Sequence, residues 1–152
     1  MFSIKIIENF DGGQIFMKYK SLNHRKFRIQ YHIIFSTKYR KKILEPIRDS
    51  LFESFHRSET LGEFEGKWEI LKMNIDKDHI HFLVSAYPEV PISSVIAIMK
   101  QTSVYDMYQQ NYDYMKKFYW CKEHKLWTKA YFVSTIGEVS EKTILDYIEN
   151  QG

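Results

Sequence analysis

The order of its predicted secondary-structure segments limits the folds open to this chain more than any other feature. Four segments rich in β-branched and aromatic residues, 26–37, 68–74, 79–86 and 130–135, are predicted as strands. Apolar residues at helical spacing predict helices over 43–58 and 92–110. The order is strand, helix, strand, strand, helix, strand. We therefore expect an α+β, ferredoxin-like split βαβ fold, an antiparallel sheet with helices on one face.

The two ends of the chain lie outside this alternation. Residues 1–17 form an N-terminal extension with a turn signal at Asp11-Gly12-Gly13, and a short helix is predicted from Ser140 to about Asn150. No Pro/Gly linker or internal repeat interrupts the sequence, and 152 residues suffice for one domain with its own core. We expect a single domain over residues 1–152.

Cysteine content and hydropathy indicate where the protein resides. Cys121 is the sole cysteine and cannot form an internal disulfide, which favours a reducing compartment. No segment approaches the roughly 18 consecutive apolar residues of a membrane span, and residues 1–20 lack the features of a signal peptide. We therefore expect a cytoplasmic protein without a membrane partner.

Positive charge is concentrated early in the chain. Between Gly12 and Leu44 there is no acidic residue but there are nine basic ones, a pattern that suits either a phosphate-binding surface or an ordinary solvated face. A second basic run, from Lys116 to Lys129, alternates with aromatic residues that suit base stacking or, equally, a sheet edge or dimer contact. The predicted DNA-binding residues are Lys18, Lys20, Arg25, Lys26, Arg28, Lys38, Arg40, Lys41, Lys42, Lys116 and Lys117.

Two histidines mark a candidate metal site. Because side chains alternate along a strand, His79 and His81 point to the same side and can both reach one divalent ion, while Ile80 packs on the other. A His-x-His pair alone is weak evidence for a metal. Asp76 and Asp78 either hold an imidazole N–H as outer-shell partners or simply cap a turn.

The closing helix carries a second candidate pair. At 100° per residue, Tyr147 and Gln151 lie one turn apart at the edge of the apolar stripe of Ile144, Leu145 and Ile148. A phenol and a neutral amide thus stand side by side. Ordinary packing of a tyrosine with a wet hydroxyl, beside a fraying glutamine, explains the same pattern.

Six stretches of the sequence together resemble a known family. They are YHIIF at 31–35, TKYRKK at 37–42, DKDHIH at 76–81, LWT at 126–128, FVSTIG at 132–137 and YIENQ at 147–151. Their joint occurrence, in this order, is similar to the single-tyrosine HUH transposases of small bacterial and archaeal insertion sequences, the IS200-like group. The likeness runs from about Tyr19 to Gln151.

The resemblance implies a mechanism and assigns the roles. Tyr147 matches the nucleophile that cleaves single-stranded DNA through a 5′-phosphotyrosine, and His79, His81 and Gln151 match the ligands of a Mg²⁺ or Mn²⁺ ion. It further implies recognition of DNA hairpins at the ends of an insertion sequence, and a homodimer in which the closing helix completes the partner's site. One departure is Val104, where the family carries a basic residue, so DNA binding by that helix is in doubt.

Three other interpretations remain open. The first is a structural zinc site formed by Cys121, His124, His79 and His81. The second is a non-catalytic RNA-binding module, because such modules share this fold. The third keeps the chemistry in a non-mobile nickase or a domesticated nuclease, which hairpin-forming DNA beside the gene would distinguish from a transposase.

Overall fold

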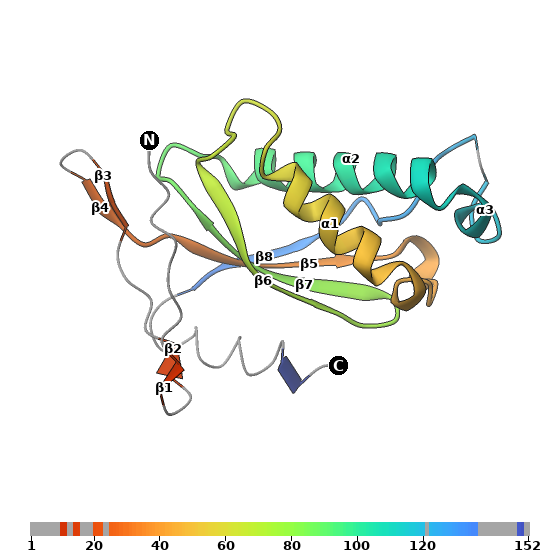
Figure 1. Cartoon of the computed structure of the whole chain (residues 1–152), viewed down its shortest axis with the longest axis horizontal. Helices are drawn as coiled ribbons and strands as arrows, with labels where there is room; N and C mark the ends of the chain where they lie inside the picture. The colour runs from red at the N-terminus through yellow and green to blue at the C-terminus, as the bar shows by residue number, and fades with distance from the viewer. Residues whose placement is uncertain are drawn as a thin grey trace.

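A four-stranded antiparallel sheet forms the centre of the protein. The computed structural model describes residues 27–120, 122–136 and 149–150, together with the backbone of short strands at 10–11, 14–15, 20–22 and 25–26. The sheet has the order β6-β7-β5-β8 (Figure 1). Its strands are β5 (Gln30–Ser36), β6 (Trp68–Ile75), β7 (His79–Ala86) and β8 (Phe132–Thr135). This order and the antiparallel pairing confirm the ferredoxin-like prediction.

Helices α1 (Arg48–Ser58) and α2 (Ile92–Gln110) lie on one face of the sheet (Figure 1). The side chains of Ile33, Phe35, Ile80, Phe82 and Val84 are fully buried beneath them. Aromatic rings interlock across this layer: Phe82 meets the ring of Phe35 at 5.0 Å and that of Phe55, from α1, at 4.7 Å. The apolar half of each strand therefore fixes which face the helices cover.

The strand register sets the composition of the opposite face. In the β5–β7 pair, Ile34 lies opposite His81 and Ser36 opposite His79. In the β5–β8 pair, Ser134 lies opposite His32. Residues that pair across an antiparallel ladder share a face. All these side chains therefore belong to a second face, which we call the histidine face.

A buried carboxylate joins the two helices. Asp106 of α2 is 5% exposed and accepts hydrogen bonds from the Oγ of Ser54 at 2.7 Å and from the guanidinium of Arg57 at 2.6 and 2.9 Å. Both partners lie on α1. Because a carboxylate leaves water only when its oxygens are paired, these contacts fix how α1 sits against α2.

Two predicted boundaries differ from the structure. The segment 26–37 is not one strand: β4 (Arg25–Phe27) pairs with β3 (Lys20–Leu22) in a separate hairpin, and β5 begins at Gln30. The first helix begins at Arg48 rather than near residue 43, after a 3-10 turn, η2 (Glu45–Ile47). Pro46 explains the delay, because a helix begun near residue 43 would need an N–H at position 46, whereas a proline in the first turn of η2 requires none.

The remaining short elements connect the main ones. The 3-10 turn η1 (Lys38–Arg40) follows β5, and a short helix, α3 (Tyr112–Met115), follows α2 in a segment where no helix was predicted. In the extension, β1 (Phe10–Asp11) pairs with β2 (Gln14–Ile15), so the chain reverses at the predicted turn. Of the predicted closing helix, residues 149 and 150 are helical, and 140–148 lie outside the described residues.

Helix length and hydropathy bear on membrane insertion. Over the portion of the chain that the structure describes, every helix is too short or too polar to cross a bilayer.

Candidate active site

His79 and His81 begin strand β7 and, as predicted, lie on the same side of it. Their ring centroids are 5.0 Å apart with the planes at 72°. The His81 side chain is almost fully buried, whereas that of His79 is 17% exposed. Ile80, between them, is fully buried under the helices. The ring of His79 therefore lies near the surface, and that of His81 is buried.

An aspartate orients the outer histidine. Asp78 Oδ1 lies 2.8 Å from His79 Nδ1, so the carboxylate accepts the Nδ1–H, and in the neutral ring the lone pair is then on Nε2. Arg40 Nε donates to the other oxygen of Asp78 at 3.0 Å. Burial alone raises the pKa of Asp78, but the hydrogen bonds from His79 and Arg40 outweigh it and lower that pKa below its ordinary value. Asp78 is therefore a carboxylate held on both sides.

A third histidine holds the inner one. His32 of β5 is 6% exposed, and its Nε2 lies 3.0 Å from the Nδ1 of His81. Burial lowers the pKa of His32. Burial, followed by the nearby His32 and His79 rings, lowers the pKa of His81 to about 4. His81 is therefore a neutral imidazole at physiological pH, the form that binds metal ions.

Asp76 combines two contacts. Its Oδ1 accepts the backbone N–H of Lys77 at 2.7 Å, which caps the β6–β7 turn, and its Oδ2 lies 3.8 Å from the Nε2 of His79. Of the two predicted roles for the aspartates, Asp76 thus caps the turn and Asp78 holds the imidazole. Within the described ranges, the structure contains no group of three His, Cys, Asp or Glu side chains able to hold a metal.

The predicted nucleophile and third ligand, Tyr147 and Gln151, lie outside the described residues. Between them in sequence, Glu149 is described, and its carboxylate forms an ion pair with Lys72 of β6 in the same chain. Lys72 lies opposite Leu83, and Asn74, two residues further along the strand, lies opposite His81. The described end of the closing helix therefore contacts the sheet close to the inner histidine.

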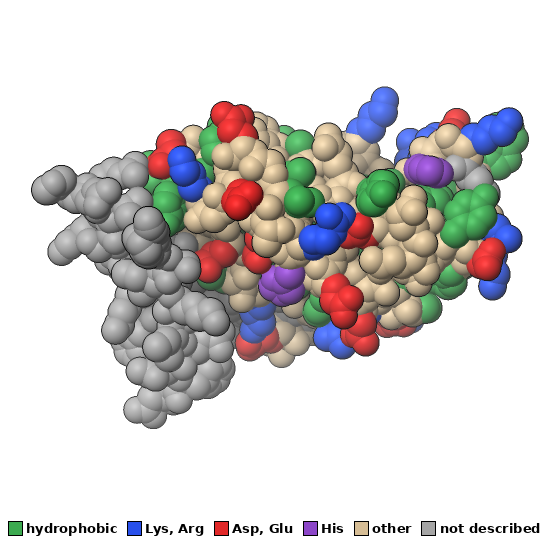
Figure 2. Space-filling view, turned by 45° about the horizontal axis from the view of Figure 1, so that its top comes forward, with side chains coloured by type: hydrophobic (Ala, Val, Ile, Leu, Met, Phe, Trp, Pro, Cys, Tyr) green, Lys and Arg blue, Asp and Glu red, His purple; other side chains and the backbone are tan. Residues whose placement is uncertain are grey.

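The two predicted basic runs converge at one end of the sheet. The loop that carries Lys38 to Lys42 hydrogen-bonds to the turn before His79, through Thr37 N to Asp78 O at 2.9 Å and Leu44 N to Lys77 O at 3.1 Å. The Lys38 N–H donates to the carbonyl of Leu126 at 2.7 Å, which joins the loop to the second run. In Figure 2 several basic side chains gather at the end that carries α3.

The structure describes the side chains of some of the predicted DNA-binding residues but not of others. Lys41 is partly exposed and Lys42 exposed, Arg28 is partly buried, and Lys116 and Lys117 follow α3 with exposed side chains. Four others have no described side chain: Lys20, Arg25 and Lys26 lie in β3 and β4, of which only the backbone is described, and Lys18 lies outside the described residues.

Strained backbone occurs beside the histidines. Tyr39 and Arg40, both in η1, have φ values of 62° and 52°, in the left-handed region that favours glycine. The Tyr39 ring is 69% exposed, with Lys38 Nζ 5.3 Å from its centroid. Two consecutive strained residues that hold an aromatic ring in solvent and a guanidinium against Asp78 are typical of a binding surface.

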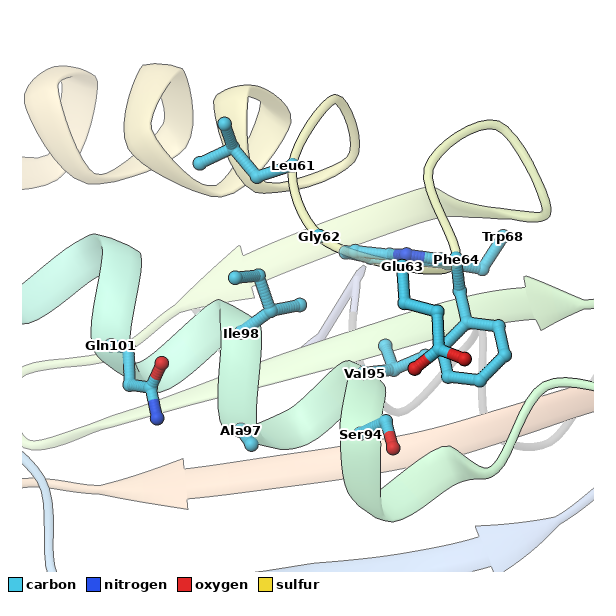
Figure 3. A pocket seen from close by; sticks show the side chains of 10 residues that line it. All are labelled: Leu61, Gly62, Glu63, Phe64, Trp68, Ser94, Val95, Ala97, Ile98 and Gln101. Atoms are coloured by element: carbon cyan, nitrogen blue, oxygen red, sulfur yellow. The ribbon is translucent and has the colours of Figure 1, made fainter.

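Two hollows lie on the helical side of the sheet. Figure 3 shows a pocket of about 240 Å³ between the loop after α1 and the start of α2, walled mainly by Leu61, Phe64, Trp68, Val95 and Ile98. A more open hollow of about 560 Å³ lies between α2 and residues 124–129, with Lys100, Lys125 and Lys129 among its walls. On the face seen in Figure 2, acidic and basic side chains are interspersed over the helices.

The alternative zinc site requires His124 beside His79 and His81. The ring of His124 instead stacks on Tyr108 of α2, with centroids 4.4 Å apart. Cys121 lies outside the described residues. The described histidines therefore give the zinc interpretation no support.

Sequence reasoning missed His32, the role of Arg40 toward Asp78, and Lys72. One signal for His32 is present: it alternates with the apolar Ile33 and Phe35 in a predicted strand, which places it on the opposite, polar face. Its meeting with His81 depends on the β5–β7 register, which the sequence does not reveal.

Comparisons with known proteins identify the family of this chain. Residues 25–151 match the family described as "Transposase IS200 like". The transposase for insertion sequence element IS200 of Salmonella typhimurium is 32% identical over 132 residues, covering 87% of this chain and 82% of the relative. The ISDra2 transposase TnpA of Deinococcus radiodurans is 28% identical over 126 residues, covering 82% and 85%.

Two solved structures share the fold. The crystal structure of a candidate transposase from Deinococcus radiodurans R1 matches with a TM-score of 0.67 and 28% identity, covering 87% of this chain and 97% of that one. The structure of a REP-associated tyrosine transposase bound to a REP hairpin matches with a TM-score of 0.59 and 13% identity, covering 84% and 70%, and so shows the fold alone. The family match and the Salmonella relative establish that this chain belongs to the IS200-like transposase family.

Proposed function

We propose that this transposase cleaves and rejoins single-stranded DNA through a covalent 5′-phosphotyrosine on Tyr147, with a divalent ion bound by His79, His81 and Gln151. The observation that supports this most is the arrangement of the histidine pair. Both Nδ1 atoms have hydrogen-bond partners, Asp78 for His79 and His32 for His81, so Nε2 is the atom that each ring would offer to the metal.

The donor set fits a divalent ion. Two rings 5.0 Å apart can bind one ion, and neutral imidazole and amide ligands leave its double charge intact. Mn²⁺ binds imidazole more tightly than Mg²⁺ does, and either suits phosphate chemistry. When bound, the ion polarises the phosphoryl oxygens of the scissile phosphate.

The covalent chemistry belongs to the tyrosine. Tyr147 Oη attacks the phosphorus and loses its proton to solvent, the bond to the 3′ oxygen breaks, and the released 3′ oxygen takes up a proton. A second 3′-hydroxyl then attacks the phosphotyrosine, which restores a phosphodiester and regenerates the phenol. The number of phosphoester bonds is conserved, so no nucleotide cofactor is consumed.

The basic end of the sheet is the proposed DNA surface. The loop of Lys38 to Lys42 touches the turn that carries Asp78, so a phosphate backbone bound there passes the histidines. We propose that the substrate folds into hairpins, as the ligand of the REP-associated relative does. Phosphate contacts would position such a hairpin and a few base contacts would select it.

The test is a covalent-adduct assay with single-stranded hairpin DNA and Mn²⁺. Wild type should give a protein–DNA band that resists denaturation, Tyr147→Phe should give none, and His81→Ala should lose nearly all of it. Tyr112→Phe, which alters a 45%-exposed tyrosine on α3, is the matched control and should keep the band. A band of normal strength from Tyr147→Phe would falsify the nucleophile assignment.

Assembly of the site is a separate part of the proposal. We propose a homodimer in which each closing helix supplies Tyr147 to the partner's histidines. The Lys72–Glu149 ion pair within one chain favours the other arrangement, a site completed by its own helix. Mixing Tyr147→Phe with His81→Ala protein decides between them. Restored adduct formation supports the shared site, and continued inactivity supports the single-chain site.

A further inference from the structure

The histidine face contains one buried imidazole that the proposed chemistry does not use. The rings of His32 and His81 lie edge to edge, with their planes at 7° and their centroids 5.3 Å apart, and their facing nitrogens are 3.0 Å apart. The two rings belong to neighbouring strands, with His32 opposite Leu83 and His81 opposite Ile34. The contact therefore follows directly from the register of the sheet.

This contact restricts the proton positions. A neutral imidazole has one N–H donor and one acceptor nitrogen, so either His32 donates to His81 or His81 donates to His32. In the first case His81 carries its proton on Nε2 and cannot bind a metal through that atom. In the second case the proton of His81 is on its Nδ1, and its Nε2 carries the lone pair that can bind a metal.

We propose that His32 is a positioning residue for the metal site, whose Nε2 accepts the Nδ1–H of His81 and thereby fixes the tautomer and orientation of that ligand. The inference rests on the proposed function, because it assumes that His81 is a metal ligand. His32 does for the buried ligand what Asp78 does for the more exposed one.

The difference between the two partners follows from their burial. His79 is 17% exposed and its partner Asp78 is 18% exposed and paired with Arg40, so a charged acceptor is tolerated there. His81 and His32 are 1% and 6% exposed. A carboxylate at that depth would lose its hydration, whereas an imidazole accepts the same hydrogen bond without burying a charge.

The surroundings hold the acceptor in place. The His32 ring contacts Phe132 of β8 edge to face, with centroids 5.6 Å apart, and its backbone pairs with β7 on one side and β8 on the other. These contacts keep the Nε2 of His32 directed toward His81. The positioning is therefore built into the centre of the sheet.

Calorimetric titration of the full chain with Mn²⁺ tests the proposal in two variants. His32→Phe keeps an aromatic ring and removes the acceptor, so the Mn²⁺ affinity should fall about ten- to hundredfold. His32→Gln places an amide oxygen near the position of Nε2 and should restore the affinity to within about threefold of wild type. A purely structural role would predict no such rescue.

The outcomes separate this inference from the proposed function. If wild type releases no binding heat with Mn²⁺, the metal site fails and this proposal fails with it. If wild type binds and His32→Phe binds equally well, only the role of His32 is overturned. Should His32→Phe not fold, ¹⁵N NMR of the wild-type imidazoles decides: a proton on Nδ1 of His81 supports the proposal, and one on Nε2 overturns it.

Discussion

At the scale of single residues, the site is a set of imidazole nitrogens fixed by their partners. Strand alternation predicts that His79 and His81 share a face, and the structure confirms it. The identity of each partner is less accessible from sequence. Asp78 is adjacent to His79 in sequence, and holding an imidazole N–H is one of the two roles predicted for it. His32 lies 49 positions from His81, and their contact depends on the strand register.

The buried histidines predict how stability varies with pH. In the fold the pKa of His81 is lowered to about 4, while in the unfolded chain it returns to its ordinary value of 6.5. The unfolded state therefore binds more protons between these values, so metal-free protein should lose about 3 kcal/mol through this group as the pH falls from 6.5 to 4, with no further loss below.

Urea unfolding of chelator-treated protein at a series of pH values measures this loss. Acidic residues also contribute to it, so the informative quantity is the difference between wild type and His81→Gln, which cannot titrate at this position. The variant should show a flatter dependence between pH 6.5 and 4. Parallel curves for the two proteins would show that His81 is not held neutral by the fold.

At the scale of elements, two of the segments match their predicted bounds. The strand from His79 to Ala86 and the helix from Ile92 to Gln110 match their predicted bounds. The errors occur where local backbone chemistry overrides periodicity. Pro46 delays α1, and a change of pairing partner divides the strand predicted over 26–37. Loop conformations such as η1 carry no periodic signal.

The left-handed backbone at Tyr39 predicts a trade between stability and binding. Glycine adopts φ of 62° without strain, so Tyr39→Gly should raise the free energy of unfolding by up to about 1 kcal/mol. Loss of the exposed ring should weaken single-stranded DNA binding about tenfold, the value of one stacked base. Tyr39→Ala removes the ring but keeps the strain, so it should lose affinity without gaining stability. Unchanged affinity in both variants would remove Tyr39 from the DNA surface.

The junction of α1 and α2 makes a separate prediction for stability. Asp106→Asn removes the charge that pairs with Arg57 and should lower the free energy of unfolding by about 1–3 kcal/mol, measured by urea denaturation. Asp113→Asn is the control, because that side chain is 89% exposed and its pair with Lys116 contributes little. Equal effects of the two substitutions would mean that the buried contact does not fix the helices.

At the scale of the whole molecule, the two faces of the sheet differ in what they carry. The helical face contains the core and the histidine face contains the candidate site, while residues 37–44 and 116–127 bring both basic runs to the sheet end beside it. The sequence predicted both basic runs but not their convergence, because that depends on contacts such as Lys38 N to Leu126 O. The resemblance to the transposase family, not periodicity, was what connected Tyr147 to the histidines.

Identification of the residue that becomes linked to DNA shows whether Tyr147 is the nucleophile. Trypsin cleavage after Lys142 releases residues 143–152, in which Tyr147 is the single tyrosine. After incubation of wild type with hairpin DNA and Mn²⁺, tandem mass spectrometry should find this peptide carrying a nucleotide through a 5′-phosphate on Tyr147. A nucleotide attached to any other of the 11 tyrosines, or linked through its 3′ end, would contradict the account.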